Sequence, residues 1–269
     1  LELKWGDVGA YIQLIGRMAA RQGFGNILAE GSQRASAIVG NGSEKYAMHI
    51  KGQDLAEQLW VHKGWALGTV VSARGGTHTR GAVLSTRFES LSPELCRKYY
   101  GLEKIGRPND YEGKAPFVVL FEKLQALGDS LGLCTFATIL WAPPPQAMDQ
   151  EDMARLFSAC TGIDISPGEL MKIGERIHNL EKAFNVLHAD WTRREDYPPW
   201  RFVEEKVMMS GPFQGECLSL EKWDKMLDEY YELHGWERKS GRPTRETLEK
   251  VGLREVADIL GRAGKLPEA

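Results

Sequence analysis

The segment Ser166-Pro-Gly-Glu-Leu-Met-Lys-Ile-Gly-Glu-Arg-Ile-His-Asn-Leu-Glu-Lys-Ala-Phe-Asn-Val-Leu187 indicates the fold class more clearly than any other part of the chain. Ser166 followed by Pro167 is a favoured helix start. Apolar residues then recur at steps of three or four, which is the spacing of one helix face. They are Leu170, Ile173, Ile177, Leu180, Phe184 and Leu187. We expect a long helix from Ser166 to about Leu187, with this stripe in the core.

The same helical spacing dominates the rest of the chain. Further helices are predicted after Asp7 up to Gly23, from Asn26 to Gly40, from Ser92-Pro93 to Gly101, around Phe117–Leu124, from Trp223 to Gly235, and as a final pair, Thr244–Val251 and Leu253–Leu260. Strands are expected only at Tyr46–Ile50 and Val70–Ser72. The predicted fold class is therefore mostly α: an irregular multi-helical domain with long functional loops and little or no β-structure.

Two long segments, residues 52–85 and 191–218, lack helical spacing. Long irregular segments in compact domains are usually functional or mobile. The first is rich in Gly, Trp and His, which makes it the more promising place for a site. A soft boundary near His49–Gly52 could separate a small N-terminal part from the rest.

Composition excludes several classes of protein. A formal net charge of −3 argues against a general nucleic-acid binder. No apolar run approaches the roughly 18 residues that cross a membrane. The four cysteines lie 38, 26 and 57 residues apart and form no CxxC pair, which is typical of reduced thiols in a cytoplasmic protein. The start, LELKWGDVGAY, has neither a signal-peptide layout nor an initiator Met, which indicates a chain that begins partway into a longer protein.

The stretch Ser72-Ala-Arg-Gly-Gly-Thr-His-Thr-Arg80 surrounds a histidine with glycines and arginines. Paired glycines let backbone N–H groups approach an anion, and Arg74 and Arg80 could neutralise phosphate. His78 could transfer protons near neutral pH. The alternative is an exposed glycine-rich loop with a solvated histidine, and so short a motif does not decide between the two.

The stretch Leu127-Gly-Asp-Ser-Leu-Gly-Leu-Cys-Thr-Phe136 places a thiol directly after a tight turn at a helix end. Gly132 permits a left-handed turn, so the Asp129 carboxylate, free backbone groups and the Cys134 sulfur could point the same way. A carboxylate suits the donor-rich edge of a pterin or purine, and a thiolate suits a soft metal. The alternative is a buried cysteine that acts as a small hydrophobic residue.

The other thiols and histidines carry weaker signals. Cys96, Cys160 and Cys217 are expected to be structural, because no metal-ligand spacing surrounds them. His178 and His188 are expected at the surface or at a helix end. His49 and His62 flank the irregular segment and remain minor candidates for a site.

Seven stretches, in order along the chain, share one resemblance. They are ARQGFGNILAEGSQRAS (20–36), GSEKYAMHIKGQDL (42–55), GWALGTVVSARGGTHTRG (64–81), LGDSLGLCTF (127–136), KIGERIHNLEKAFNV (172–186), RFVEE (201–205) and MLDEYYELHGW (226–236). Together they resemble the tungsten-dependent aldehyde ferredoxin oxidoreductase family over nearly the whole chain. In that family two helical domains follow an N-terminal domain. The resemblance implies that residues 1–48 end the middle domain and residues 49–269 form the C-terminal domain.

The resemblance also assigns cofactors and site residues. The family holds a metal between two pterin dithiolenes, and its DxxGLC motif contacts one pterin and supplies the fourth ligand of a [4Fe–4S] cluster. This motif falls on Asp129, Gly132, Leu133 and Cys134. The other three cluster ligands would lie in a CxxCxxxC motif before Leu1. The family's active-site histidine, in an RGG-x-H context, falls on His78, and Arg80 falls where a basic residue helps to hold the cofactor.

Two departures from the family pattern affect the expected activity. Many members carry Tyr-Asp-Pro-Arg beside the substrate cavity, where this chain has Glu57-Gln-Leu-Trp60, so Trp60 and Trp65 are expected to reshape or narrow that cavity. The first helix has Tyr11-Ile12 and no histidine, so a metal shared between subunits is not expected. The aldehyde itself stays open.

The resemblance implies oxidation of an aldehyde to a carboxylic acid, with electrons passed through a tungsten or molybdenum bis-pterin and a [4Fe–4S] cluster to ferredoxin or a similar carrier. Because one thiolate cannot replace four, this chain alone is expected to be an inactive fragment without either group. Two alternatives remain: an aromatic acyl-thioester reductase of the same family, which the RGG-x-H stretch favours less, and a cofactor-free helical interaction module. No nucleic-acid or membrane partner is expected, and homo-oligomer formation stays open.

Overall fold

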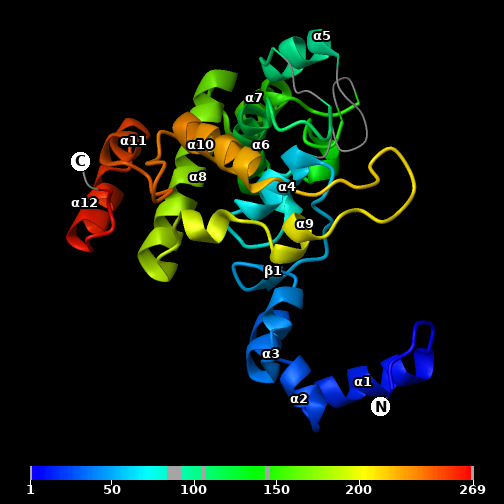
Figure 1. Ribbon diagram of the computed structural model, residues 1–269. Helices are drawn as coiled ribbons and strands as arrows, with labels where there is room; N and C mark the ends of the chain where they lie inside the picture. The colour runs from blue at the N-terminus through cyan, green and yellow to red at the C-terminus, as the bar shows by residue number, and fades with distance from the viewer. Residues whose placement is uncertain (1, 84–91, 104–106, 143–145, 268–269) are drawn as a thin grey trace.

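The structure is a computed structural model that describes residues 2–83, 92–103, 107–142 and 146–267. It confirms the mostly helical class, and its described part holds one two-stranded hairpin (Figure 1). Its longer helices are α1 (Val8–Ala19), α3 (Ser32–Val39), α4 (Lys63–Val70), α6 (Lys114–Leu131), α7 (Gln150–Thr161), α8 (Pro167–Ala189), α10 (Leu220–His234) and α12 (Arg254–Arg262). Shorter ones are α2 (Phe24–Leu28), α5 (Pro93–Leu95), α9 (Trp200–Glu204), α11 (Arg245–Lys250), and η1 to η5 (Ser43–Tyr46, His78–Arg80, Cys96–Tyr100, Thr135–Ala137, Arg193–Asp196).

The core of the body forms where α6 packs against α8, α10 and α4. Large buried side chains fill this centre: Trp65, Phe117, Phe121, Trp223, Tyr230 and Tyr231. Gly174 of α8 lies directly against α6, and a Cβ at this position would be 2.5 Å from the carbonyl oxygen of Lys123. Only glycine permits so close an approach of the two helices.

α8 begins as predicted but buries a different face. Ser166 accepts a hydrogen bond from the Glu169 N–H at 3.2 Å, and Glu169 Oε2 accepts one from the Ser166 N–H at 3.0 Å, which completes a capping box. Leu170 is buried, but Leu180 and Phe184 are 45% and 60% exposed, so the expected apolar core stripe is wrong at these two positions. The buried face carries polar groups instead: His178, Asn179 and Lys182.

The N-terminal helices are shorter than predicted. α1 has its predicted N-cap, Asp7 Oδ1, which accepts from the Ala10 N–H at 2.9 Å, but the helix ends at Ala19 rather than at Gly23. The single helix expected from residue 26 to 40 is two helices, α2 and α3. Gly31, with φ of +83°, separates them, because a left-handed residue cannot continue an α-helix.

The predicted strands are largely wrong. Of Tyr46–Ile50, only β1 (His49–Ile50) is extended, and it pairs antiparallel with β2 (Gln53–Asp54). Val70–Ser72 is the end of α4 and the turn after it. The segment 52–85, whose last two residues lie outside the described ranges, is not irregular throughout, because α4 is buried along its whole length inside it. A helix that is enclosed on all sides needs no polar face, and its sequence therefore shows no helical period.

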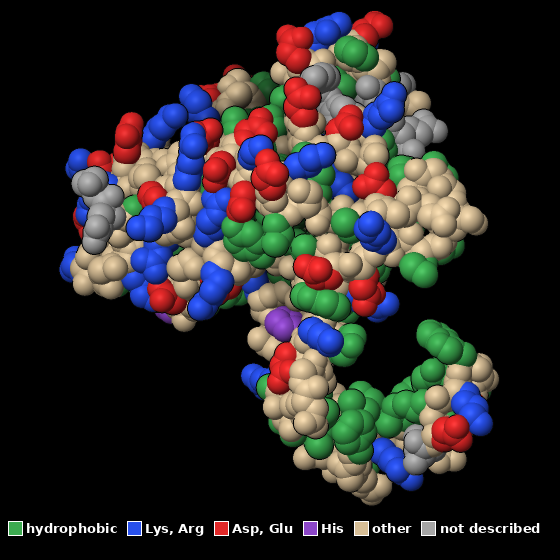
Figure 2. Space-filling model, viewed as in Figure 1, with side chains coloured by type: hydrophobic (Ala, Val, Ile, Leu, Met, Phe, Trp, Pro, Cys, Tyr) green, Lys and Arg blue, Asp and Glu red, His purple; other side chains and the backbone are tan. Residues whose placement is uncertain are grey.

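Helices α1 to α3 project from the body as an arm (Figure 1). The Ser32 N–H and hydroxyl both donate to Asp54 Oδ1, at 3.0 and 2.6 Å, and join this arm to the hairpin. Apolar side chains run along the arm (Figure 2), and Ile12 and Ile15 are each 64% exposed. The division of the chain at residue 48 stays a prediction. Within the described ranges, no helix combines the length and apolar character that a bilayer crossing requires.

Candidate functional site

The glycine-rich loop before His78 is packed against the hairpin. Gly75 and Gly76 are buried, and the Gly76 N–H donates to the Ile50 carbonyl at 3.2 Å. Gly75 has φ of +103°, and a Cβ there would lie 2.9 Å from the Cβ of Gln53. The two glycines are therefore packed rather than exposed, and at Gly75 both sterics and backbone conformation require glycine.

His78 lies in η2 with its ring held on two sides. Its Nδ1 is 2.5 Å from Glu57 Oε1, and its ring stacks on the buried Trp65 with a centroid separation of 4.9 Å. The carboxylate favours Nδ1 as the donor, which leaves the lone pair of the ring on Nε2. The side chain is 38% exposed, so the imidazole is both oriented and reachable.

Arg80 connects this loop to two core helices. Its guanidinium lies 2.6 Å from Asp129 Oδ2 at the end of α6 and 3.2 Å from Glu181 Oε1 on α8. The Arg80 Nε is buried and has no hydrogen-bond partner within the part of the chain that the structure describes. Burial raises the pKa of Glu181, and the charge of Arg80 opposes that rise.

The turn after α6 presents Cys134 to solvent. The Leu133 N–H donates to the Gly128 carbonyl at 2.8 Å and the Gly132 N–H to the Asp129 carbonyl at 3.3 Å, with Gly132 at φ of +70°, which is a Schellman turn. Leu133 packs against the small cluster of Leu127, Met153, Ala154 and Leu170. Cys134 is exposed, so the alternative of a buried packing cysteine is wrong.

The structure brings some predicted site residues together and leaves others apart. Arg80 and Asp129 form one ion pair, and the Gln125 amide donates to Asp129 Oδ1 at 2.8 Å and to Thr135 Oγ1 at 3.2 Å. Among the described residues, no hydrogen bond or ion pair joins His78 to the turn at 129–134. The contact of Glu57 with His78 was not predicted from the sequence, where Glu57 stands only as a departure from the family pattern. A carboxylate within a segment rich in Trp and His was the signal that could have indicated it.

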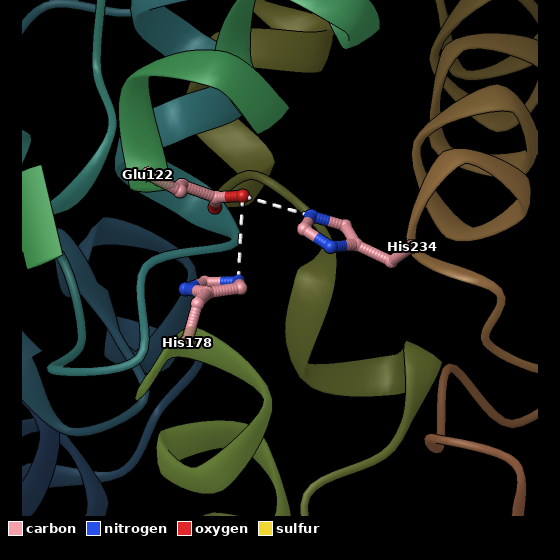
Figure 3. A group of neighbouring side chains, drawn as sticks. All are labelled: Glu122, His178 and His234. Carbon is pink, nitrogen blue, oxygen red and sulfur yellow. Dashed lines mark hydrogen bonds and ion pairs between the residues drawn. The ribbon is translucent and has the colours of Figure 1, made fainter. Parts of the chain in front are cut away.

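Outside this region, three polar residues meet in the core (Figure 3). Glu122 of α6 lies between His178 of α8 and His234 at the end of α10, and all three are buried. Its Oε2 is 2.9 Å from His234 Nε2 and 3.3 Å from His178 Nε2. The surface position expected for His178 is therefore wrong. Glu122 and His234 were missed, because they lie 112 residues apart in sequence and meet only through tertiary packing.

Burial controls the protonation of this group. It raises the pKa of Glu122 to about 7 and lowers the pKa of His178 to about 4 and of His234 to about 3, because each charged form would lose its hydration. The two imidazoles are therefore neutral at physiological pH.

Of the thiols expected to be structural, Cys96 is fully buried, whereas Cys160 is exposed.

A protein-family profile described as aldehyde ferredoxin oxidoreductase, domains 2 and 3, matches residues 1–253. The chain belongs to the aldehyde ferredoxin oxidoreductase family. It is 34% identical over 254 residues to the tungsten-containing aldehyde ferredoxin oxidoreductase of Pyrococcus furiosus and 35% identical to that of Pyrococcus horikoshii. Each alignment covers 94% of this chain and 38% of the relative, so the chain spans well under half the length of these relatives.

Other members and one solved structure widen the comparison. The aliphatic sulfonate oxidoreductase, WOR-like subunit, of Pyrococcus furiosus is 30% identical over 269 residues, which cover 95% of this chain and 36% of that one. The active site complex BamBC of benzoyl coenzyme A reductase, solved with 1,5-dienoyl-CoA, matches with a TM-score of 0.76 at 23% identity, over 99% of this chain and 42% of that one. At this identity the structural match shows a shared fold alone.

Proposed function

We propose that this chain forms part of an enzyme of the family that oxidises an aldehyde to a carboxylic acid. Water supplies the added oxygen, and two electrons and two protons are released. The electrons pass by way of a tungsten (or molybdenum) bis-pterin and a [4Fe–4S] cluster to ferredoxin or a similar carrier. Family membership and the names of the relatives from Pyrococcus support this activity.

The Arg80–Asp129 ion pair is the single observation that carries the proposal. It brings the loop with His78 against the turn with Cys134, at a distance of 2.6 Å between guanidinium nitrogen and carboxylate oxygen. His78 lies two residues before Arg80, and Cys134 lies five residues after Asp129. An imidazole can exchange a proton, and an exposed thiolate can bind an iron of a cluster, so the pair connects two motifs suited to proton-coupled redox chemistry.

The residues present fit the cofactors that the family implies. The unpartnered, buried Nε of Arg80 retains one donor for an oxygen-rich anionic group. Beside it, Glu181, Arg74 and Phe184 line a surface hollow of about 460 Å³. Cys134 projects from a turn with no competing partner among its described neighbours, as a cluster ligand requires.

Each side chain then has one role. When bound, the pterin-held metal supplies a Lewis acid and an electron acceptor. Asp129, held by Arg80 and Gln125, would accept hydrogen bonds from a pterin edge, and Cys134 would bind one iron as a thiolate. His78 would take up or release a proton at Nε2, while Glu57 keeps Nδ1 protonated. Trp65 supports the imidazole from below.

The experiment that tests the proposal uses the full-length protein, purified without oxygen and analysed for tungsten, molybdenum and iron. Turnover is measured with a dye acceptor on a panel of aldehydes, an aromatic acyl thioester and an aliphatic sulfonate, the last because of the 30% identical relative. We expect aldehydes to be oxidised. Activity only on the thioester or the sulfonate would overturn the substrate class.

A histidine pair separates the role of His78 from general damage. His78→Ala should abolish turnover and leave the metal content unchanged, whereas His188→Ala, at an exposed position of α8, should leave both unchanged. Undiminished turnover in His78→Ala would remove this residue from its proposed role. The 269-residue chain alone should hold neither tungsten nor acid-labile sulfide, because one thiolate cannot replace the four ligands of a cluster, and stoichiometric amounts of both would contradict this expectation.

A further inference from the structure

The cluster of Glu122, His178 and His234 is the most unusual polar arrangement outside the proposed site. Its members come from α6, α8 and α10, the three helices that form the core, and their exposed fractions are 1%, 4% and 4%. Figure 3 shows both imidazoles directed toward the same carboxylate. A buried carboxylate between two histidines needs a physical explanation, because polar groups are costly to bury unless they are satisfied.

The ligand atoms have the separation of a metal site. One atom from each residue lies within 4.8 Å of the other two. Glu122 Oε2 is 2.9 Å from His234 Nε2 and 3.3 Å from His178 Nε2. Donors at about 2.1 Å from a tetrahedral Zn²⁺ lie about 3.4 Å apart, so two of the three separations already suit one ion.

A hydrogen-bonded arrangement without metal leaves one atom unsatisfied. His178 Nε2 is buried and has no hydrogen-bond partner among the described residues, although it lies 3.3 Å from the Glu122 carboxylate. Tyr230 donates to Glu122 Oε1 at 2.8 Å, and Oε2 shares a hydrogen bond with His234 Nε2 at 2.9 Å. An ion at the centre would give the His178 nitrogen the partner that protein groups do not provide.

The surroundings hold the three side chains in place. The Trp236 ring stacks on His234 at 4.3 Å between centroids and on His178 at 5.7 Å, and its own N–H donates to Asn179 Oδ1 at 2.8 Å. Glu181 Oε2 lies 3.9 Å from His178 Nδ1, on the side away from Glu122. Metal-binding histidines commonly have a carboxylate beyond their second nitrogen, which orients the ring.

The charged side chains around the cluster are mostly paired with one another. Lys123 pairs with Glu175 at 3.0 Å, and Glu181 pairs with Arg80 at 3.2 Å. Lys182 and Lys51 share Asp196, at 3.4 and 2.7 Å. Among the described residues, the ion-pair partners of Glu122 are the two histidines of the cluster.

We propose that Glu122, His178 and His234 bind a divalent first-row transition metal ion, with Zn²⁺ as the expected occupant. Two imidazoles and one carboxylate are a known ligand set for such ions. The ion would join α6, α8 and α10 and would lie beneath the loop that carries His78. Gly81 of that loop packs so closely on Glu122 that a Cβ would lie 2.3 Å from the glutamate Cγ. Its three ligands take no part in the cofactor region proposed above, although Glu181 borders both places, and the proposal does not depend on that region.

The test measures metal in the purified 269-residue chain, expressed with added zinc and handled without chelators. We expect about one equivalent of Zn²⁺ by mass spectrometry and no acid-labile sulfide. Expression with cobalt should give the intense visible absorption of a low-symmetry Co²⁺ site, which reports on coordination without any variant. Circular dichroism establishes that each preparation has the helix content of the structure.

Single variants then locate the ion. His178→Gln and His234→Gln should each reduce bound zinc at least about tenfold, whereas the matched His188→Gln, on the exposed side of α8, should retain it. A folded wild-type chain with less than about a tenth of an equivalent of zinc, and without the cobalt spectrum, would overturn the proposal and leave a hydrogen-bonded core cluster. Equal loss in all three variants would also overturn it.

Discussion

At the scale of single residues, the contact between Glu57 and His78 determines what the imidazole can do. The 2.5 Å separation of Glu57 Oε1 and Nδ1 fixes the tautomer, and Trp65 fixes the ring plane. A histidine that exchanges protons with substrate works only if the correct nitrogen faces the reaction. The departure from the family pattern at residues 57–60 therefore lies against the proposed catalytic histidine.

Replacing Glu57 by glutamine tests this orientation in the full-length enzyme. An amide still fits the position but can offer either its oxygen or its NH₂ group to Nδ1, so both tautomers become accessible. We expect kcat to fall about ten- to a hundredfold, with little change in KM or metal content. Glu246→Gln, at an exposed position of α11, is the matched control. An unchanged kcat in Glu57→Gln would show that the carboxylate does not orient the histidine.

Lys114 predicts a pH dependence of stability. Burial lowers its pKa from 10.5 to about 8 in the folded chain, although its Nζ donates to the Arg107 carbonyl at 2.7 Å. Between about pH 8 and pH 10.5, Lys114 is protonated in the unfolded chain and largely neutral in the folded chain. The unfolded chain therefore binds more protons, and the contribution of Lys114 to the free energy of unfolding rises with pH. From about pH 7.5 to about pH 10, the wild type should gain about 2 kcal/mol of unfolding free energy relative to Lys114→Met.

Urea unfolding of both proteins at the two pH values measures this difference. For the control Lys250→Met, at an exposed position, the difference in unfolding free energy from the wild type should be the same at both pH values. A constant difference between the wild type and Lys114→Met would mean that this ammonium group is solvated in the folded chain.

At the scale of elements, α8 contributes neighbouring residues to both sites, since His178 and Glu181 lie one turn apart. Glu181 contacts Arg80, and His178 contacts Glu122, from the same helix.

The N-terminal cap that positions this helix is therefore expected to matter for stability. Ser166→Ala removes the hydroxyl that accepts from the Glu169 N–H and should lower the unfolding free energy by about 1 kcal/mol. Ser210→Ala, in an exposed loop, should change it by less than about 0.5 kcal/mol. Equal effects of the two changes in urea unfolding would disprove the cap.

A helix with one apolar face was predictable from its spacing. α10 is found where this spacing predicts it, because it packs one side on the core. α6 is also found around Phe117–Leu124, although it is buried on most of its circumference. α4 was missed because protein surrounds it and its residues show no period. On α8 the apolar stripe misled the prediction: Leu180 is exposed, whereas the polar His178 is buried by partners from other helices.

The candidate site divides in the same way. His78, Arg80, Asp129 and Cys134 stand in two short motifs, so local sequence was enough to propose them. Which of them meet could not be predicted, since the Arg80–Asp129 pair joins residues 49 apart. Glu122 and His234 belong to helices whose contact depends on the whole core, and no spacing in the chain announces it.

At the scale of the whole molecule, the arm of α1 to α3 exposes an apolar face. Ile12 and Ile15 lie on the same side of α1, and Trp5 before it is fully exposed. Exposed apolar patches of this kind favour association. We expect the 269-residue chain to self-associate with rising concentration, as sedimentation velocity would show.

Ile12→Glu with Ile15→Glu should shift this chain toward monomer and retain the helix, since glutamate is a good helix former. The matched control, Met208→Glu with Met209→Glu, adds the same charge at two exposed apolar positions outside the arm and should leave the association unchanged. Equal dissociation by both pairs would point to charge rather than to the arm.

Because Gly174 has no side chain, α6 and α8 pack at a short distance that no other residue would allow. Because Asp129 extends from α6 and Glu181 from α8, the interval between these helices is also the span that one guanidinium has to cover. A methyl group at Gly174 would widen that span and detach Arg80 from one acidic neighbour. In a redesign of this scaffold toward new substrates, the exposed Leu180 and Phe184 can be varied. A saturation library at Gly174, selected for folded protein, should return only glycine.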